Sequence, residues 1–133
     1  MISNEKLIFL AEKARENAYA PYSHFKVGAA LLTEKGEVYC GCNVENASFG
    51  ETVCAERTAF LKAVSEGKSD FTKIAVVGGN EAETKSTYPC GACRQVMAEF
   101  CKQDFVIVIK DGMEIKELLL KDILPFSFNN SVL

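Results

Sequence analysis

A short segment of the sequence, ETVCAERTAF at residues 51–60, combines a thiol, a carboxylate and a guanidinium. Cys54, Glu56 and Arg57 fall within four consecutive positions of what is otherwise an ordinary amphipathic helix pattern. One such cluster has an ordinary explanation, because cysteine is a common small buried residue and Glu–Arg is a common surface ion pair. The chemistry of this segment therefore depends on what else the chain can bring to it.

A second segment, PCGACRQ at residues 89–95, supplies two more thiols. Cys90 and Cys93 are three positions apart at the predicted start of a helix, so their side chains share one face of it. Two thiolates on one helical face can chelate a metal ion. Thioredoxin-like proteins also place a Cys-x-x-Cys pair at a helix N-terminus, for redox chemistry. By itself this motif leaves both interpretations open.

Taken together, the two segments favour a catalytic zinc site. Cys54 would add a third thiolate to Cys90 and Cys93 and leave the fourth tetrahedral position free for water. Glu56 can then take a proton from that water and pass it to a leaving group, provided that Cys54 stands at the very start of its helix. Arg57 and the helix N-termini can withdraw negative charge from the sulfurs, which would otherwise weaken zinc as a Lewis acid. We therefore expect one Zn²⁺ per chain.

Composition argues against several other classes of protein. The net charge of -3, the pI near 5.2 and the lack of a basic run argue against a nucleic-acid partner, since affinity for phosphate backbones depends on Lys and Arg. The shares of hydrophobic (48%) and charged (25%) residues are typical of a soluble globular protein, and we expect no membrane partner. The apolar run at residues 7–11 is too short for a secretory signal, so we expect a cytoplasmic protein with reduced cysteines. A small, uncharged ligand fits these properties.

The elements that must position the two motifs alternate between helix and strand. The strongly apolar run at residues 71–79 indicates a strand that is buried on both faces. The full pattern predicts a helix before Pro21, a hairpin of strands 25–33 and 37–42, an irregular stretch 43–52, a helix 53–65, the strand 71–79, a loop 80–88, a helix 89–100, a strand 104–110 and a short helix 117–123. This order predicts an α/β fold, a three-layer α/β/α sandwich with a mixed central sheet, in a single domain spanning residues 1–133.

Both cysteine segments resemble the zinc motif of the cytidine deaminase family. The matching residues are CAE at 54–56 and PCGACRQ at 89–95, and the segments YSHFKVGAAL (22–31), NVENAS (43–48) and LPFSF (124–128) are also similar. The resemblance covers nearly the whole chain and points to the short branch with three cysteine ligands. It implies zinc-dependent hydrolytic deamination of cytidine and deoxycytidine in pyrimidine salvage, in which metal-bound hydroxide attacks C4 and a non-ligand glutamate shuttles protons.

The same resemblance implies roles for residues outside the zinc motif. Asn43 and Glu45 would hydrogen-bond the ribose 3′-hydroxyl, while Phe25 and Ala55 would contact the nucleoside. Short members of the family are homotetramers, and Phe128 would cap the base in a neighbouring subunit's site. These roles come from the likeness and not from composition or spacing.

Several of these residues also have an ordinary structural interpretation. Arg57 can be a surface ion-pair partner, and Asn43 and Glu45 can shape a turn. Burial is the expectation for the cysteines outside the two motifs, which are Cys40, Cys42 and Cys101.

Two alternative functions remain besides cytidine deamination. A non-catalytic zinc or redox binding module is one, and a structural zinc site would need a fourth protein ligand. A deaminase of another small aminopyrimidine, such as a nucleoside antibiotic, is the other, since it would share the zinc motifs. The segment NVENAS at 43–48 favours cytidine because it supplies the Asn and Glu expected to read a ribose. Phe49 follows it where many relatives carry Tyr, so a hydroxyl is lacking there.

Overall fold

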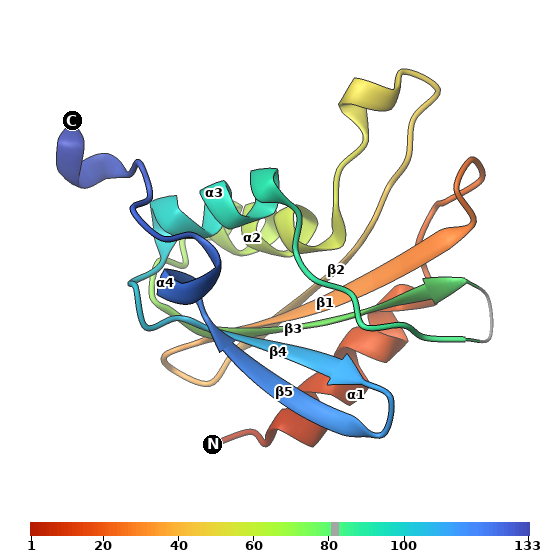
Figure 1. Ribbon diagram of the computed structural model, residues 1–133, viewed down its shortest axis with the longest axis horizontal. Coiled ribbons are helices and arrows are strands. Elements are labelled where there is room, and N and C mark those ends of the chain that lie inside the picture. The colour runs from red at the N-terminus through yellow and green to blue at the C-terminus, as the bar shows by residue number, and fades with distance from the viewer. Residues whose placement is uncertain (81–82) are drawn as a thin grey trace.

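The structure, a computed structural model, describes residues 1–80 and 83–133; the expected loop at 80–88 includes residues 81–82, which lie outside this description. Within the described residues, five strands form one sheet in the order β2-β1-β3-β4-β5 (Figure 1). The strands are β1 (Phe25–Thr33), β2 (Val38–Cys42), β3 (Phe71–Asn80), β4 (Val106–Asp111) and β5 (Glu114–Leu119). The helices are α1 (Asn4–Arg15), α2 (Ala55–Ser65), α3 (Gly91–Phe100) and α4 (Leu120–Ile123), with 3-10 turns η1 (Phe49–Glu51) and η2 (Asn130–Val132).

Strand direction places the starts of α2 and α3 at the same end of the sheet. β1 pairs antiparallel with both β2 and β3, so β2 and β3 run in the same direction. β3 in turn pairs parallel with β4, and a parallel pair needs a crossover connection, which here contains α3. α2 follows β2 and α3 follows β3 in the chain. Both helices lie over one face of the sheet, and their N-termini point towards the end at which β2 and β3 finish (Figure 1).

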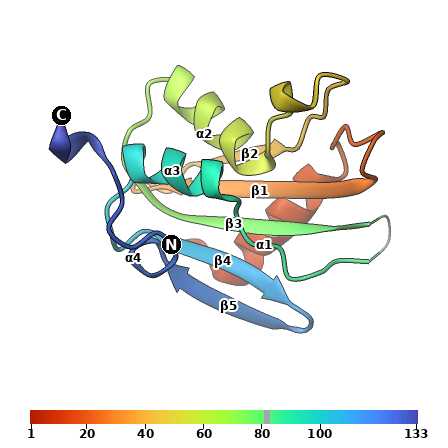
Figure 2. The same cartoon turned by 45° about the horizontal axis from the view of Figure 1, so that its top comes forward.

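Helices cover both faces of the sheet, as the α/β prediction requires (Figure 2). Side chains at alternate strand positions face opposite sides. In β1, Val27, Ala29 and Leu31 belong to the core beneath α2 and α3, whereas Ala30 and Leu32 pack against α1. The prediction of a strand at 71–79 that is buried on both faces is confirmed, because β3 contributes buried side chains to both cores.

The predicted helix over 117–123 is wrong in its first half. Glu114–Leu119 forms the edge strand β5, which pairs antiparallel with β4, and only Leu120–Ile123 is helical. A turn at Gly112, with φ of +65°, returns the chain alongside β4. The backbone of β4 then offers hydrogen bonds that outweigh the helical preference of a Glu- and Leu-rich segment. The first helix, predicted before Pro21, ends at Arg15.

Candidate functional site

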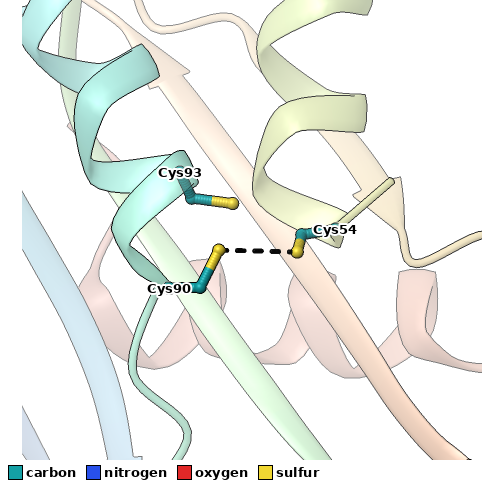
Figure 3. A group of neighbouring side chains, drawn as sticks. All are labelled: Cys54, Cys90 and Cys93. Carbon is teal, nitrogen blue, oxygen red and sulfur yellow. Dashed lines mark hydrogen bonds between the residues drawn. The ribbon is translucent and has the colours of Figure 1, made fainter. Parts of the chain in front are cut away.

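The three motif cysteines meet where α2 and α3 begin (Figure 3). Cys54 is the N-cap residue of α2 and Cys90 is the N-cap residue of α3, both with extended backbone angles. Cys93 lies in the first turn of α3 and is fully buried. The requirement that Cys54 stand at the very start of its helix is therefore met. Each helix begins two residues later than predicted, at Ala55 and at Gly91.

A close backbone approach at Gly41 sets the position of α2. A Cβ atom at Gly41 of β2 would lie 2.6 Å from the backbone nitrogen of Ala59 and 2.7 Å from the carbonyl oxygen of Ala55. Any side chain there would push the first turn of α2 away from the sheet. Gly41 thus helps to place Cys54 and Glu56, a role that the sequence did not reveal because glycine is also common in hairpins.

The three sulfur atoms have the spacing of a zinc site. They all lie within 4.8 Å of one another, and the Sγ atoms of Cys54 and Cys90 are 3.7 Å apart. Tetrahedral zinc with Zn–S bonds of about 2.3 Å places its ligand sulfurs about 3.8 Å apart. Among the described His, Cys, Asp and Glu residues, none adds a fourth ligand to this group. The donor set therefore fits zinc with one open coordination position, as in catalytic sites.

Arg57 supplies positive charge to the sulfurs. Its Nη2 atom donates a hydrogen bond to Cys54 Sγ over 3.5 Å. A hydrogen bond from Cys93 is the main influence that lowers the pKa of the Cys54 thiol, and Arg57 acts in the same direction. The bond to Cys54 correspondingly raises the pKa of Arg57. These interactions favour the thiolate form of Cys54, which is the form that binds a metal.

Glu56 is a buried carboxyl beside the sulfur cluster. Only 4% of the residue is exposed, and burial raises the pKa of its carboxyl to about 7. A carboxyl group with such a pKa can both accept and return a proton near neutral pH. Glu56 lies in the first turn of α2, two residues after Cys54. This position keeps its carboxyl close to the sulfurs, but Glu56 is not among the possible metal ligands.

A cavity of about 140 Å³ is lined by Glu56 and by two of the three clustered cysteines, Cys54 and Cys90. Of the predicted substrate residues, Asn43 and Ala55 line it. Four further wall residues were not among the candidates predicted from the sequence. Of these, only Thr87 and Tyr88 had a signal, which is their position directly before the second cysteine segment. The complete lining is Val27, Asn43, Thr52, Cys54, Ala55, Glu56, Thr87, Tyr88 and Cys90.

Asn43 is fixed by the backbone of β1. Its Oδ1 accepts a hydrogen bond from Val27 N and its Nδ2 donates one to Phe25 O, both over 2.8 Å. The amide is 8% exposed. Asn43 therefore shapes the local backbone, as the turn interpretation held, and also contributes to the cavity wall.

Glu45 lies in an adjoining hollow instead of the thiol cavity. This second hollow, of about 370 Å³, is lined by Tyr22, Ser23, Glu45, Phe49 and Thr52. Thr52 lines both spaces, so the two are neighbours. A ligand held by Glu45 at one end could extend past Thr52 towards Glu56.

Two predicted substrate residues are not among the cavity lining in the described part of this chain. Phe25 packs against the core beneath α2 and α3. Phe128 is 60% exposed, and its carbonyl oxygen accepts a hydrogen bond from Gln95 Nε2 over 2.7 Å. The chain then ends at a distance from the starts of α2 and α3 (Figure 1).

The remaining cysteines stand apart from the sulfur cluster. Cys40 packs partly against the core beneath α1, and burial raises its pKa and that of Cys42. Cys101 is the C-cap residue of α3, and burial raises its pKa as well. All three are partly buried free thiols, close to the expected burial.

The fold and the three-thiol site together define a zinc-binding deaminase domain. The family model for the cytidine and deoxycytidylate deaminase zinc-binding region matches residues 1–109. A cytidine deaminase from Sporosarcina psychrophila is 50% identical over 126 residues, which cover 94% of this chain and 90% of the relative. The chain belongs to the cytidine deaminase family, as its motifs predicted.

A solved structure and a more distant relative are also similar to this chain. The crystal structure of cytidine deaminase from Burkholderia pseudomallei matches with a TM-score of 0.88 and 47% identity, covering 96% of this chain and 100% of that one. A blasticidin-S deaminase from Bacillus cereus is 30% identical over 129 residues, covering 92% of this chain and 91% of the relative. Among the described residues, no helix is both long and apolar enough to cross a membrane.

Proposed function

We propose that this protein converts cytidine and deoxycytidine to uridine and deoxyuridine, with release of ammonia. The observation that carries the proposal is that Glu56 lines one cavity together with Cys54 and Cys90, two of the three clustered cysteines. Cys54, Cys90 and Cys93 would hold one zinc ion, which supplies an activated water at its open position when bound.

Glu56 is the proposed proton carrier of this reaction. Its carboxylate takes a proton from the attacking water and delivers it to the departing amine, so that water adds at C4 and ammonia leaves. Burial favours this exchange because it raises the pKa of Glu56 to about 7. Arg57 and the first turns of α2 and α3 reduce the negative charge of the thiolates.

The residues that we assign to substrate binding favour a free nucleoside. Ala55 and Asn43 line the cavity beside Glu56, and Glu45 lies in the adjoining hollow, where it would accept a hydrogen bond from the ribose 3′-hydroxyl. The same carboxylate would repel a 3′-phosphate. Polynucleotides are therefore poor candidates, and the net charge of -3 points the same way.

A neighbouring subunit would complete the site. We propose a homotetramer in which Phe128 caps the base in the site of another subunit, with Phe25 packing on the nucleoside. The support is that the C-terminal segment leaves Phe126, Phe128 and Leu133 largely exposed. Burying such apolar side chains against another copy would be favourable. We further propose that residues 1–133 act as one catalytic domain, in the cytoplasm, in pyrimidine salvage.

An ultraviolet assay tests the proposed substrate directly. Wild-type protein is given cytidine, deoxycytidine, cytidine 3′-phosphate and an aminopyrimidine nucleoside antibiotic in parallel. We expect turnover of the first two, with at most weak activity on the others. Preferred turnover of the antibiotic would replace this proposal by the alternative deaminase function. Absence of turnover with all four, in protein that carries zinc, would contradict both.

A further inference from the structure

The carboxylate of Glu45 is held by donors from one short turn. Its Oε1 accepts hydrogen bonds from Tyr22 N over 2.9 Å and from Ser23 N over 3.1 Å. Its Oε2 accepts a short hydrogen bond from the Ser23 hydroxyl. An ionised carboxylate has about four acceptor positions, so these three donors leave one position, on Oε2, for the hydroxyl of a ligand.

The Ser23 hydroxyl also connects Glu45 to the first strand. Ser23 Oγ accepts a hydrogen bond from Phe25 N over 3.0 Å. Phe25 O in turn accepts from Asn43 Nδ2 over 2.8 Å. A continuous series of hydrogen bonds therefore joins Glu45, Ser23, Phe25 and Asn43. Of these four residues, only Ser23 has no assigned contact with substrate.

The backbone around Ser23 is arranged to present its donors. Glu45 N donates to Tyr19 O over 2.8 Å, and Tyr19 N donates to Asn43 O over 3.0 Å, so the turn is tied to the segment that carries Glu45. His24 N donates to Ala20 O over 3.0 Å and closes the turn. His24 adopts a φ of +59°, a left-handed backbone conformation that is unfavourable for a non-glycine residue. The hydrogen bonds to Glu45 help to offset this cost.

We propose that Ser23 is a positioning residue for ribose recognition, which aligns Glu45 so that its free acceptor position meets the 3′-hydroxyl. The inference rests on the proposed function, in which Glu45 reads that hydroxyl. The hydrogen bond from Ser23 is also the main influence that lowers the pKa of Glu45, which keeps the carboxylate ionised as an acceptor. A residue acting in this way should affect only substrates that carry a 3′-hydroxyl.

The test compares cytidine with 3′-deoxycytidine on full-length, zinc-loaded Ser23→Ala, Ser23→Thr and wild-type proteins. For Ser23→Ala we expect kcat/KM to fall about tenfold for cytidine but by less than about twofold for 3′-deoxycytidine. Ser23→Thr keeps a hydroxyl and should restore most of the preference for cytidine. Ser48→Ala is the matched control, because this serine lies in the same loop as Glu45 and its side chain makes no capping hydrogen bond. It should leave the ratio of the two substrates unchanged.

A double mutant identifies which assumption fails if the result differs. In the Glu45→Ala background, Ser23→Ala should have no further effect on the substrate ratio. Suppose that Glu45→Ala changes the substrate ratio, but Ser23→Ala lowers kcat/KM equally for both substrates or for neither. The positioning role of Ser23 is then wrong, although Glu45 reads the ribose. If Glu45→Ala leaves the ratio unchanged, the role of Glu45 is wrong and that of Ser23 is wrong with it. Failure of the wild-type protein to deaminate cytidine would instead contradict the proposed function itself.

Discussion

The Sγ atoms of Cys54 and Cys90 lie 3.7 Å apart although the two residues are separated by 36 positions in the chain. Each is the N-cap residue of a helix, and the two helices follow strands that run in the same direction. Two helix N-termini therefore converge on the sulfur cluster, where their positive ends favour thiolates. The sheet topology therefore brings the three cysteines together.

Zinc content should depend on the cluster and not on cysteine in general. We expect one zinc ion per chain in the purified protein, and loss of most of it in Cys90→Ala, because two thiolates alone hold zinc weakly. Elemental analysis against protein concentration measures this ratio. Cys42→Ala, which removes a thiol outside the cluster, should keep full zinc. An unchanged ratio in Cys90→Ala would exclude this ligand set.

Glu56→Gln should separate metal binding from turnover. The amide keeps the shape of the side chain but cannot carry a proton, so we expect deamination to fall by about 10²–10⁴-fold. Zinc content should stay at the wild-type ratio, and the melting temperature should not fall, since Gln avoids burying a charge. Glu66→Gln, at the exposed end of the same helix, should retain normal activity. Near-normal turnover in Glu56→Gln would show that another group transfers the proton.

Replacing Arg57 should weaken the site without removing a ligand. Partners of metal ligands typically contribute about 10–100-fold in metal affinity or activity, and we expect Arg57→Ala to lose an amount in this range. Arg57→Lys keeps the charge but not the planar set of donors, so its activity should lie between those of wild type and Arg57→Ala. Zinc affinity by competition with a chelator, measured beside kcat/KM, checks this order. Wild-type zinc affinity and kcat/KM in both variants would contradict a role of Arg57 at the sulfurs and favour its interpretation as a surface ion-pair partner.

Gly41→Ala should damage both stability and the site. Its new Cβ would fall 2.6–2.7 Å from backbone atoms of α2, and such overpacking typically costs about 1–3 kcal/mol. Because α2 carries Cys54 and Glu56, activity should also fall in the fraction that remains folded. Gly50→Ala is the control, since a Cβ at Gly50 meets no atom within 4 Å. Denaturant unfolding measures the stability of both variants, and the deamination assay measures their activity. Wild-type stability and activity in Gly41→Ala would show that the close approach does not position α2.

Mixing two inactive variants tests whether Phe128 acts on a neighbouring subunit. Phe128→Ala and Glu56→Gln should each have low activity alone. Dissociated and reassembled together, they should recover activity, because some sites combine an intact Glu56 with a neighbour's intact Phe128. The double mutant Phe128→Ala/Glu56→Gln, mixed with wild type in the same way, sets the level expected from dilution of intact chains. A fully active monomer in sedimentation, or no recovery on mixing, would contradict the shared site.

The sequence by itself determined the family, the three cysteines that cluster in the fold and most of the elements. The two cysteine segments are local patterns, and each predicts a helix start with thiols on one face, which the structure shows for Cys90 and Cys93. The apolar run at 71–79 likewise predicted a strand buried on both faces. Such features follow from the spacing of neighbouring residues, which sequence displays directly.

Only the tertiary structure decided what depends on contacts between distant segments. Residues 114–119 became a strand because β4 lies beside them, which their own helix-like composition did not indicate. Thr52 lies in the cavity wall, and the Ser23 hydroxyl meets Glu45, through contacts between segments that are distant in the chain. The physical reason is that local propensities amount to tenths of a kcal/mol per residue, whereas strand pairing and burial against a distant segment contribute more and therefore prevail.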